Sequence, residues 1–265
     1  MTGMIRSVQW LWALSVAAQV AVFWLLIYRR HFRRLPFFTA YVTANLCQAV
    51  FLVAVYIHSG FNSSTAFTLA WAAEAITLIA RAFAITEIIR LVLGPYRGVW
   101  ALGWRLLTGV AVVVIFYATI GVGGSMDWIV LAADRGFHLA FAAVLVGFFL
   151  LVRYYAVPIR ALHRALLGGF CFYSCTVVLT NTLYRVLFLR SSAYYEAVWG
   201  DAKLLAYIAV QAVWAVALLK PLPVVEQEPV LLPASVYQEV SSSVQPSLQA
   251  LNNRLAALLR VGESR

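Results

Sequence analysis

Residues 69–94 read LAWAAEAITLIARAFAITEIIRLVLG, a stretch that is long and apolar enough to cross a bilayer. It nevertheless contains four charged residues, Glu74, Arg81, Glu87 and Arg90. A charge near the centre of a membrane costs about 3 kcal/mol or more. Such residues are therefore paired, turned toward the protein interior or used in function, and the rest of the sequence must supply their surroundings.

The composition of the whole chain is that of a membrane protein. Of its 265 residues, 63% are hydrophobic and 11% are charged, and the mean hydropathy is +0.86. These values exclude an ordinary soluble domain. The three cysteines lie within apolar runs, so no disulfide framework is indicated. We expect an all-α integral membrane protein with one membrane domain and no separate soluble enzyme.

Seven apolar runs predict a polytopic bundle of seven transmembrane helices within residues 1–220. Breakers such as Pro36, Pro158 and the segment SGFNSS mark the short connections between them. The predicted spans are residues 8–28, 37–58, 66–93, 100–123, 128–155, 165–189 and 202–219.

The distribution of basic residues predicts the orientation of this bundle. With the N-terminus outside, eleven lysines and arginines fall on the inner side, against Arg6, Arg190 and Lys203 on the outer side. Basic residues in short loops stay in the cytoplasm. We therefore expect a multi-pass protein of the inner membrane with a cytoplasmic C-terminus. Its net charge of +10 then belongs to a surface that faces anionic lipid, and a nucleic-acid partner is not expected.

The charged residues of the opening stretch fall into two pairs. Glu74 and Arg81 are seven residues apart and share one stripe of the helix, which we expect to face the bundle interior. Glu87 and Arg90 lie on roughly the opposite side, at the inner interface, and we expect them to pair with each other at little cost. Loss of Glu74 should therefore destabilise the protein more than loss of Glu87.

Further polar side chains occur at similar depths on the other predicted helices. In the run LAADRGFHLAF, the side chains of Asp134, Arg135 and His138 project from neighbouring parts of one helix. By depth, Glu74 best matches His138 or Arg135, Asp134 lies nearest the level of Arg185, and Arg81 has only neutral partners. The candidate pocket residues are Glu74, Arg81, Asp134, Arg135, His138, Asn181, Arg185 and Gln211.

Three functions are compatible with such a cluster. The charges can simply balance one another and hold the helices together, as in a structural subunit of a membrane complex. They can form an outward-facing pocket that binds a ligand of unknown identity, as in a receptor-like, sensory or accessory protein. They can also serve a small solute or proton-coupled transporter that uses Glu74, Asp134 and His138.

Several kinds of chemistry lack the residues that they need. The last apolar run has lysines only at its ends, which excludes a retinal attachment site, and only His138 lies deep among the four histidines, which is too few for a zinc site. No nucleotide-binding, hydrolase or kinase signature occurs. The sequence therefore predicts no enzyme, no catalytic residue, no metal and no cofactor.

The segments YRRHFRRLPFFTAY, EIIRLVLGPYRGVWALGWRLL and DRGFHLAFAAVLVGFFLLVRYY carry a resemblance that extends over most of residues 8–220. In them the chain resembles a group of bacterial seven-helix integral membrane proteins of uncharacterised activity. More distantly, it is similar to the seven-helix sensor modules of bacterial histidine kinases, although no phosphoacceptor region follows the last apolar run. The resemblance implies the fold and the membrane location.

The remaining residues form a tail of different composition. Residues 221–243 contain four prolines, which favour an extended cytoplasmic linker. In residues 244–265 five leucines fall on one helical stripe, so we expect a short amphipathic helix. Such a helix can lie on the membrane or bind a cytoplasmic or membrane protein.

Overall fold

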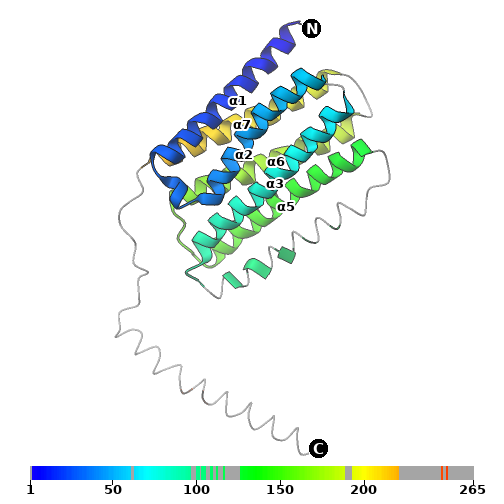
Figure 1. Ribbon diagram of the computed structural model, residues 1–265. Coiled ribbons are helices and arrows are strands. Elements are labelled where there is room, and N and C mark those ends of the chain that lie inside the picture. Colours follow the sequence, from blue (N-terminus) through cyan, green and yellow to red (C-terminus); the bar gives the residue numbers. More distant parts are fainter. Residues whose placement is uncertain are drawn as a thin grey trace, which may run out of the picture. The chain divides into compact units, whose positions relative to one another are not determined.

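A computed structural model of the chain describes residues 2–60, 63–96, 126–188 and 193–220, with isolated positions between 100 and 116 and at 246 and 249. Every regular element in this part of the chain is helical (Figure 1). The elements are α1 (Thr2–Tyr28), the short 3₁₀ helix η1 (His31–Arg33), α2 (Pro36–Ser59), α3 (Ser64–Leu93), α5 (Met126–Tyr154), α6 (Ala161–Phe188) and α7 (Ala193–Leu219).

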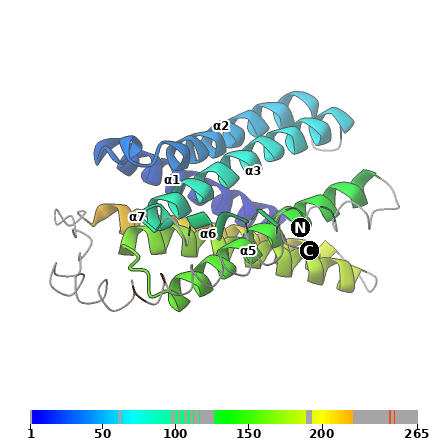
Figure 2. The ribbon, with the colours of Figure 1, turned by 90° about the horizontal axis from the view of Figure 1, so that it is seen from below.

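The six long helices pack in a closed ring. Going around it, α1 contacts α2, α2 contacts α3, α3 contacts α5, α5 contacts α6, α6 contacts α7, and α7 returns to α1. A further contact between α3 and α6 crosses the ring. Figure 2 shows α2 and α3 on one side of the bundle and α5, α6 and α7 on the other. Side chains from α3 and from α5 to α7 can therefore meet inside it.

The helix ends follow local signals in the sequence. Gly60 ends α2 with φ of 75°, a backbone conformation that glycine adopts without strain. Ser63 then caps α3 by accepting a hydrogen bond from the Ala66 N–H at 3.0 Å. After α5 the chain turns at Ala156, with φ of 49°, and Pro158 prevents α5 from continuing into α6.

The start of α2 is capped from another helix. Leu35 precedes α2 and offers no capping side chain, and Pro36 at the first helical position has no N–H. The free N–H groups of Phe37 and Phe38 instead donate to the two carboxylate oxygens of Glu87 on α3, at 3.2 and 2.9 Å. The predicted pair between Glu87 and Arg90 is therefore wrong: Arg90 is exposed, while Glu87 satisfies two backbone donors that have no partner within α2.

An aromatic cluster fills the bundle interior. Phe38 and Tyr41 of α2, Phe170 of α6 and Trp214 of α7 are at most 1% exposed, and their ring centroids lie 4.8 to 6.3 Å apart. The indole N–H of Trp214 donates to the Leu166 carbonyl at 3.2 Å.

A small residue on α6 makes room for this indole. A Cβ atom at Gly169 would lie 2.3 Å from Nε1 of Trp214 and 2.9 Å from a methyl group of Val210. Both distances are shorter than any real contact, so the close approach of α6 and α7 depends on glycine at this position.

The outer surface of the bundle is apolar. Within the part of the chain that the structure describes, five helical segments are long and apolar enough to span a membrane: Trp10–Tyr28, Pro36–Ser59, Ala133–Tyr154, Ala161–Leu183 and Gly200–Leu219. They mark the chain as an all-helical membrane protein. Although α3 is not among them, its outward face carries Ile76, Ile79 and Phe83, which are 55 to 63% exposed, whereas Arg81 on its inner face is 2% exposed.

The connection between α1 and α2 holds a buried histidine. His31 in η1 is 5% exposed and is hydrogen bonded to the backbone of Leu218 at the end of α7. Burial lowers the pKa of His31, and the charges of Arg34 and Arg29 lower it further, against the opposing effect of the Leu218 hydrogen bond. The ring is therefore neutral and ties η1 to α7.

The predicted helices agree with those observed wherever the structure describes them. Their positions shift by a few residues, except that α1 begins six residues before the predicted span and α7 begins nine residues before it. The predicted span 100–123, apart from isolated positions, the linker 221–243 and most of the predicted helix 244–265 lie outside the described residues. Met1–Lys220 form one compact unit.

Candidate functional site

A cavity of about 540 Å³ lies among α1, α2, α3, α6 and α7. It lies in the half of the bundle that is farther from η1. This position is shown by α2, whose cavity-lining residues come later in the helix than its residues of the aromatic cluster. Its polar lining comprises Glu74, Asp201, Arg81, Lys203, Ser15, Gln19, Asn45, Gln48, Tyr173 and Tyr207. The predicted inward orientation of Glu74 and Arg81 is confirmed, since both line this cavity.

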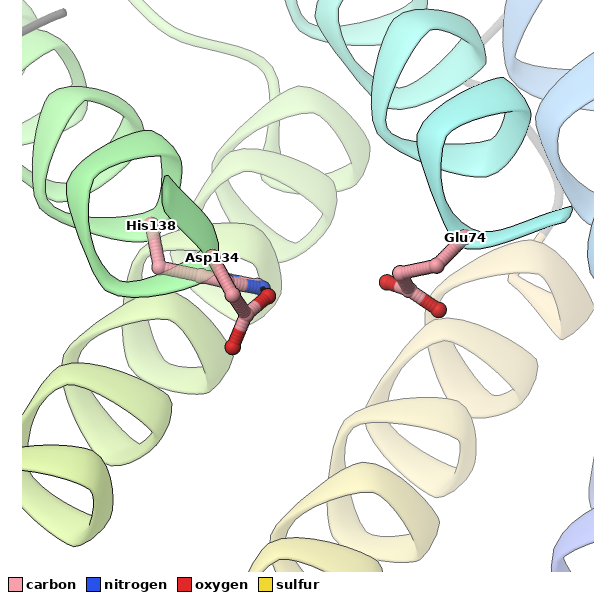
Figure 3. Close-up of side chains that lie close together, drawn as sticks. All are labelled: Glu74, Asp134 and His138. Atoms are coloured by element: carbon pink, nitrogen blue, oxygen red, sulfur yellow. Dashed lines mark ion pairs between the residues drawn. The ribbon is translucent and has the colours of Figure 1, made fainter. Parts of the chain in front are cut away.

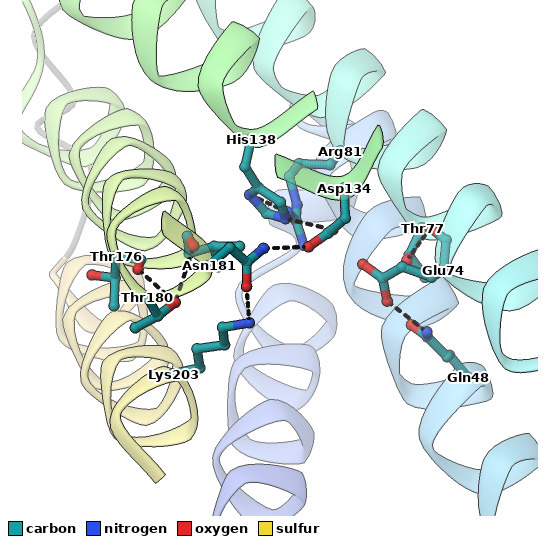
Figure 4. Close-up of polar contacts among 11 residues, drawn as sticks. Gln48, Glu74, Thr77, Arg81, Asp134, His138, Thr176, Thr180, Asn181 and Lys203 are labelled. Atoms are coloured by element: carbon teal, nitrogen blue, oxygen red, sulfur yellow. Dashed lines mark hydrogen bonds and ion pairs between the residues drawn. The ribbon is translucent and has the colours of Figure 1, made fainter. Parts of the chain in front are cut away.

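A continuous chain of polar contacts, here called the polar arc, connects α7 with α3 through residues of α6 and α5 (Figure 4). Lys203 donates to the side-chain carbonyl of Asn181, whose amide donates to Oδ2 of Asp134 at 2.8 Å. The other oxygen of Asp134 lies 3.6 Å from Nε2 of His138. His138 in turn contacts Nη1 of Arg81, so both ends of the polar arc, Lys203 and Arg81, return to the cavity.

Arg81 is held by neutral groups. Its Nη1 lies 3.2 Å from Nε2 and 3.4 Å from Nδ1 of His138. Because a guanidinium group only donates, the ring nitrogen that accepts must be unprotonated, and His138 is neutral in this arrangement. The rings of Tyr41 and Tyr173 lie 5.6 and 5.2 Å from Cζ, within the range of cation–π attraction.

The charge of Arg81 is not neutralised by direct contact. Among the side chains that the structure describes, neither Arg81 nor Lys203 forms an ion pair with a carboxylate. The Nε of Arg81 is buried and has no hydrogen-bond partner. A buried guanidinium donor without an acceptor is unfavourable, and this donor belongs to a residue that lines the cavity.

Glu74 lines the same cavity two turns before Arg81 on α3. Its Oε2 accepts a hydrogen bond from Nε2 of Gln48 on α2 at 2.9 Å. Thr77, one turn further along α3, donates its hydroxyl to the Glu74 backbone carbonyl at 2.8 Å and so carries no interaction with the carboxylate. Glu74 is thus a half-buried carboxylate with one side-chain donor, and most of its acceptor capacity is left for other groups.

Glu74, Asp134 and His138 approach one another closely enough to be compared with a metal site. One potential ligand atom from each lies within 4.8 Å of the others. Figure 3 shows these side chains, which come from α3 and α5, pointing toward one another. The prediction that Glu74 lies at the level of His138 is confirmed. However, the guanidinium of Arg81 lies against His138, where it would repel a divalent cation. The donor set therefore favours hydrogen bonding over metal ligation.

The other predicted pocket residues take different positions. Asn181 joins Lys203 to Asp134 and is 3% exposed. Gln211 is 1% exposed and interacts with the side chain of Tyr207, so it lies beside the cavity without lining it. Arg135 is half-buried and does not line the cavity. The side chain of Arg185 lies outside the described residues.

Two expectations about charge pairing are corrected. Arg81 was expected to have only neutral partners, and His138 was matched by depth to Glu74, but Arg81 contacts His138 directly. Lys203 was expected at the outer end of the last helix, but α7 begins at Ala193, so Lys203 lies within the helix and enters the polar arc. Sequence analysis also did not include Tyr41 and Tyr173 in the site. An arginine inside an apolar helix was the signal that aromatic partners were needed.

Comparisons with protein-family models, curated proteins and solved structures gave no match to this chain. The site must therefore be interpreted from its own geometry.

Proposed function

We propose that this chain is a multi-pass protein of the inner membrane with seven transmembrane helices, its N-terminus outside and its C-terminus in the cytoplasm. Five segments that can span a membrane support this proposal, together with the exposed apolar face of α3. Residues 100–123 supply the remaining span, as their apolar sequence indicates. The excess of basic residues in the connections on one side supports the orientation.

Reporter fusions test the topology independently of function. Fusions after Pro36, after Pro158 and at the C-terminus should report the cytoplasm, and fusions at Ser63 and Ser191 should report the outside. A single reversed result would require a different number of spans or the opposite orientation.

Within this architecture we propose that the protein is receptor-like or accessory and binds a small polar ligand in the cavity. The observation that carries the proposal is that two polar atoms of cavity-lining residues have no hydrogen-bond partner among the described groups: Arg81 Nε and Gln19 Oε1. A bundle in which the charges served only to balance one another would satisfy these atoms internally. The size of the cavity is also typical of small-molecule sites.

Native mass spectrometry of the purified protein tests this function. We expect a small molecule to remain bound after mild purification and to be lost when Glu74 is replaced by glutamine. A protein that retains no ligand, and whose melting temperature is unchanged by any small polar molecule, would support a structural subunit instead.

A transporter is the second candidate, and the proximity of Glu74, Asp134 and His138 favours it. Three groups that can exchange protons lie within 4.8 Å of one another beside a cavity, which is the arrangement that proton coupling requires. Uptake into proteoliposomes distinguishes the two functions. A pH-dependent flux that Glu74→Gln abolishes would replace the receptor-like function with transport.

The C-terminal residues supply a possible partner surface. The leucine stripe of residues 244–265 favours contact with a cytoplasmic or membrane protein, or with the bilayer. This arrangement is consistent with the resemblance to sensor modules, in which a membrane domain passes a signal to another component. Copurification with and without residues 244–265 tests the partner: loss of a stoichiometric protein on truncation is the expected result.

A further inference from the structure

We infer that the ligand of the cavity is a small zwitterion, a molecule with a carboxylate and an ammonium group such as a free amino acid. The carboxylate lies against Arg81 and Lys203, and the ammonium group lies against Glu74. This inference rests on the proposed binding function and adds the chemical class of the ligand to it.

Arg81 carries a donor that no described group of the protein uses. Its Nε is buried without a partner, and the guanidinium is contacted by the His138 ring and by two tyrosine rings. None of these groups carries a negative charge. A carboxylate is the acceptor that best matches an Nε and Nη pair, because it accepts two parallel hydrogen bonds.

Lys203 provides a second positive group at the cavity wall. Its ammonium donates to the neutral carbonyl of Asn181, and no described carboxylate forms an ion pair with it. An ammonium group has three donors, so two remain for other acceptors. Asn181 lies between Lys203 and Asp134, because its carbonyl accepts from the ammonium and its amide donates to Oδ2 of Asp134. The polar arc thus positions both cations without neutralising either by direct contact.

Glu74 provides the complementary negative group in the same cavity. Glu74 accepts one hydrogen bond from the neutral Gln48 amide, which leaves oxygen lone pairs available for a cationic donor. The carbonyl oxygen of Gln19, on a residue only 6% exposed, lines the same cavity and has no donor. An ammonium group can donate to both, since it carries three N–H bonds.

Charge balance favours a zwitterion over a simple anion or cation. The side chains that line the cavity include two acids, Glu74 and Asp201, and two bases, Arg81 and Lys203. A ligand with one charge of each sign leaves this balance unchanged, whereas an ion of a single sign adds an uncompensated charge to a low-dielectric site. The guanidinium beside His138 also disfavours a divalent cation at Glu74, Asp134 and His138.

The test uses the full-length protein in detergent, with the standard free amino acids as probes. Native mass spectrometry and thermal melting identify those that bind, and each is compared with its N-acetyl and carboxamide derivatives. Removing either charge should weaken binding at least about tenfold, the loss expected for one hydrogen bond between charged groups.

Two variants test which residues of the cavity bind the ammonium group and the carboxylate of the ligand. In Glu74→Gln the preference for the free amino acid over its N-acetyl derivative should disappear, while the preference over the carboxamide remains. In Lys203→Gln the preference for the free amino acid over its carboxamide should disappear, while the preference over the N-acetyl derivative remains. A merely structural role would weaken all three ligands together. Arg90→Gln is the control, because Arg90 is exposed at the end of α3 away from the cavity and should leave every preference unchanged.

Two negative outcomes distinguish the zwitterion inference from the proposed binding function. If the protein retains or binds a molecule that lacks either charge, or a divalent metal ion, while no free amino acid binds, the zwitterion inference is overturned and the binding function stands. If neither a retained molecule nor any probe is detected, both are overturned.

Discussion

Replacing Glu87 with alanine should weaken the attachment of α2 to α3. The carboxylate accepts two backbone hydrogen bonds, from Phe37 at 3.2 Å and Phe38 at 2.9 Å, and no side chain at Leu35 can take its place. Loss of a helix cap costs about 1 kcal/mol, and hydrogen bonds to charged groups contribute about 1.5 to 3 kcal/mol each. Because the carboxylate is only half-buried and water can partly replace it, we expect a loss of about 2 kcal/mol.

For a chain of this size, 2 kcal/mol corresponds to a decrease in melting temperature of about 4 to 8 °C. Glu87→Gln keeps one carbonyl acceptor and should lose about half as much. Arg90→Ala, at an exposed position one turn away, should change the melting temperature little. Hydrogen exchange supplies the local measurement, since the amides of Phe37 and Phe38 should exchange faster in Glu87→Ala.

Two results together would refute this role of Glu87: Glu87→Ala has the same melting temperature as Arg90→Ala, and the amides of Phe37 and Phe38 exchange at unchanged rates. The sequence alone predicted that Glu74→Ala would be the more damaging substitution. With its two backbone hydrogen bonds, Glu87 is now expected to matter at least as much as Glu74, whose described hydrogen-bond donor is Gln48.

Three other substitutions follow from the packing, each measured by thermal melting in detergent. Gly169→Ala should destabilise the protein by about 1 to 3 kcal/mol, because its Cβ would collide with Trp214 and Val210, whereas Gly168→Ala, with nothing within 4 Å of its Cβ, should not. Arg81→Lys should destabilise by about 2 kcal/mol or more, since an ammonium group cannot contact two tyrosine rings and His138 at once; equal melting of Arg81→Lys and Arg90→Lys would contradict this. His31 is neutral in the folded protein because burial lowers its pKa, so the unfolded state protonates first, and stability should fall as the pH drops below about 6.5 and level off below the folded pKa. His31→Gln should flatten this dependence, His58→Gln should not, and identical pH profiles for the two variants would rule the explanation out.

The helices were predictable because their signals are local. Apolar length identifies each span, and breakers such as Pro36, Gly60 and Pro158 act on the residues beside them. The start of α7 was not predicted, since the polar residues between Ala193 and Lys203 resemble a loop by composition. Helical hydrogen bonds continue through them because none of these residues is a proline, and polar side chains do not by themselves end a helix.

Part of the site could be predicted from helix geometry alone. The spacing of Asp134 and His138 places both on one face of α5, and the spacing of Glu74 and Arg81 places both on one face of α3. The contact between Arg81 and His138 was missed because depth was estimated from backbone positions. A side chain on a helix points toward the N-terminus of that helix. The long side chain of Arg81 therefore reaches back along α3 to the level of His138.

The role of Glu87 was missed for a different reason. The predicted partner of Glu87 lay on the same helix, whereas the N–H groups that donate to Glu87 lie about 50 residues away in the chain. A usable signal was nevertheless present. The start of α2 has leucine where serine, threonine, aspartate or asparagine would ordinarily cap it, so its free N–H groups required an acceptor from elsewhere.

The separation of charges in the bundle argues that the cluster does more than hold the helices together. Glu74 and Arg81 occupy one stripe of α3, and a bundle selected only for stability would join such charges directly or replace them with apolar side chains. Instead Gln48 holds Glu74, while His138 and two tyrosine rings hold Arg81, so that opposite charges face one cavity without direct contact. Leaving Arg81 Nε buried without a partner lowers stability. An arrangement that sacrifices stability at the wall of a cavity is typical of a binding site.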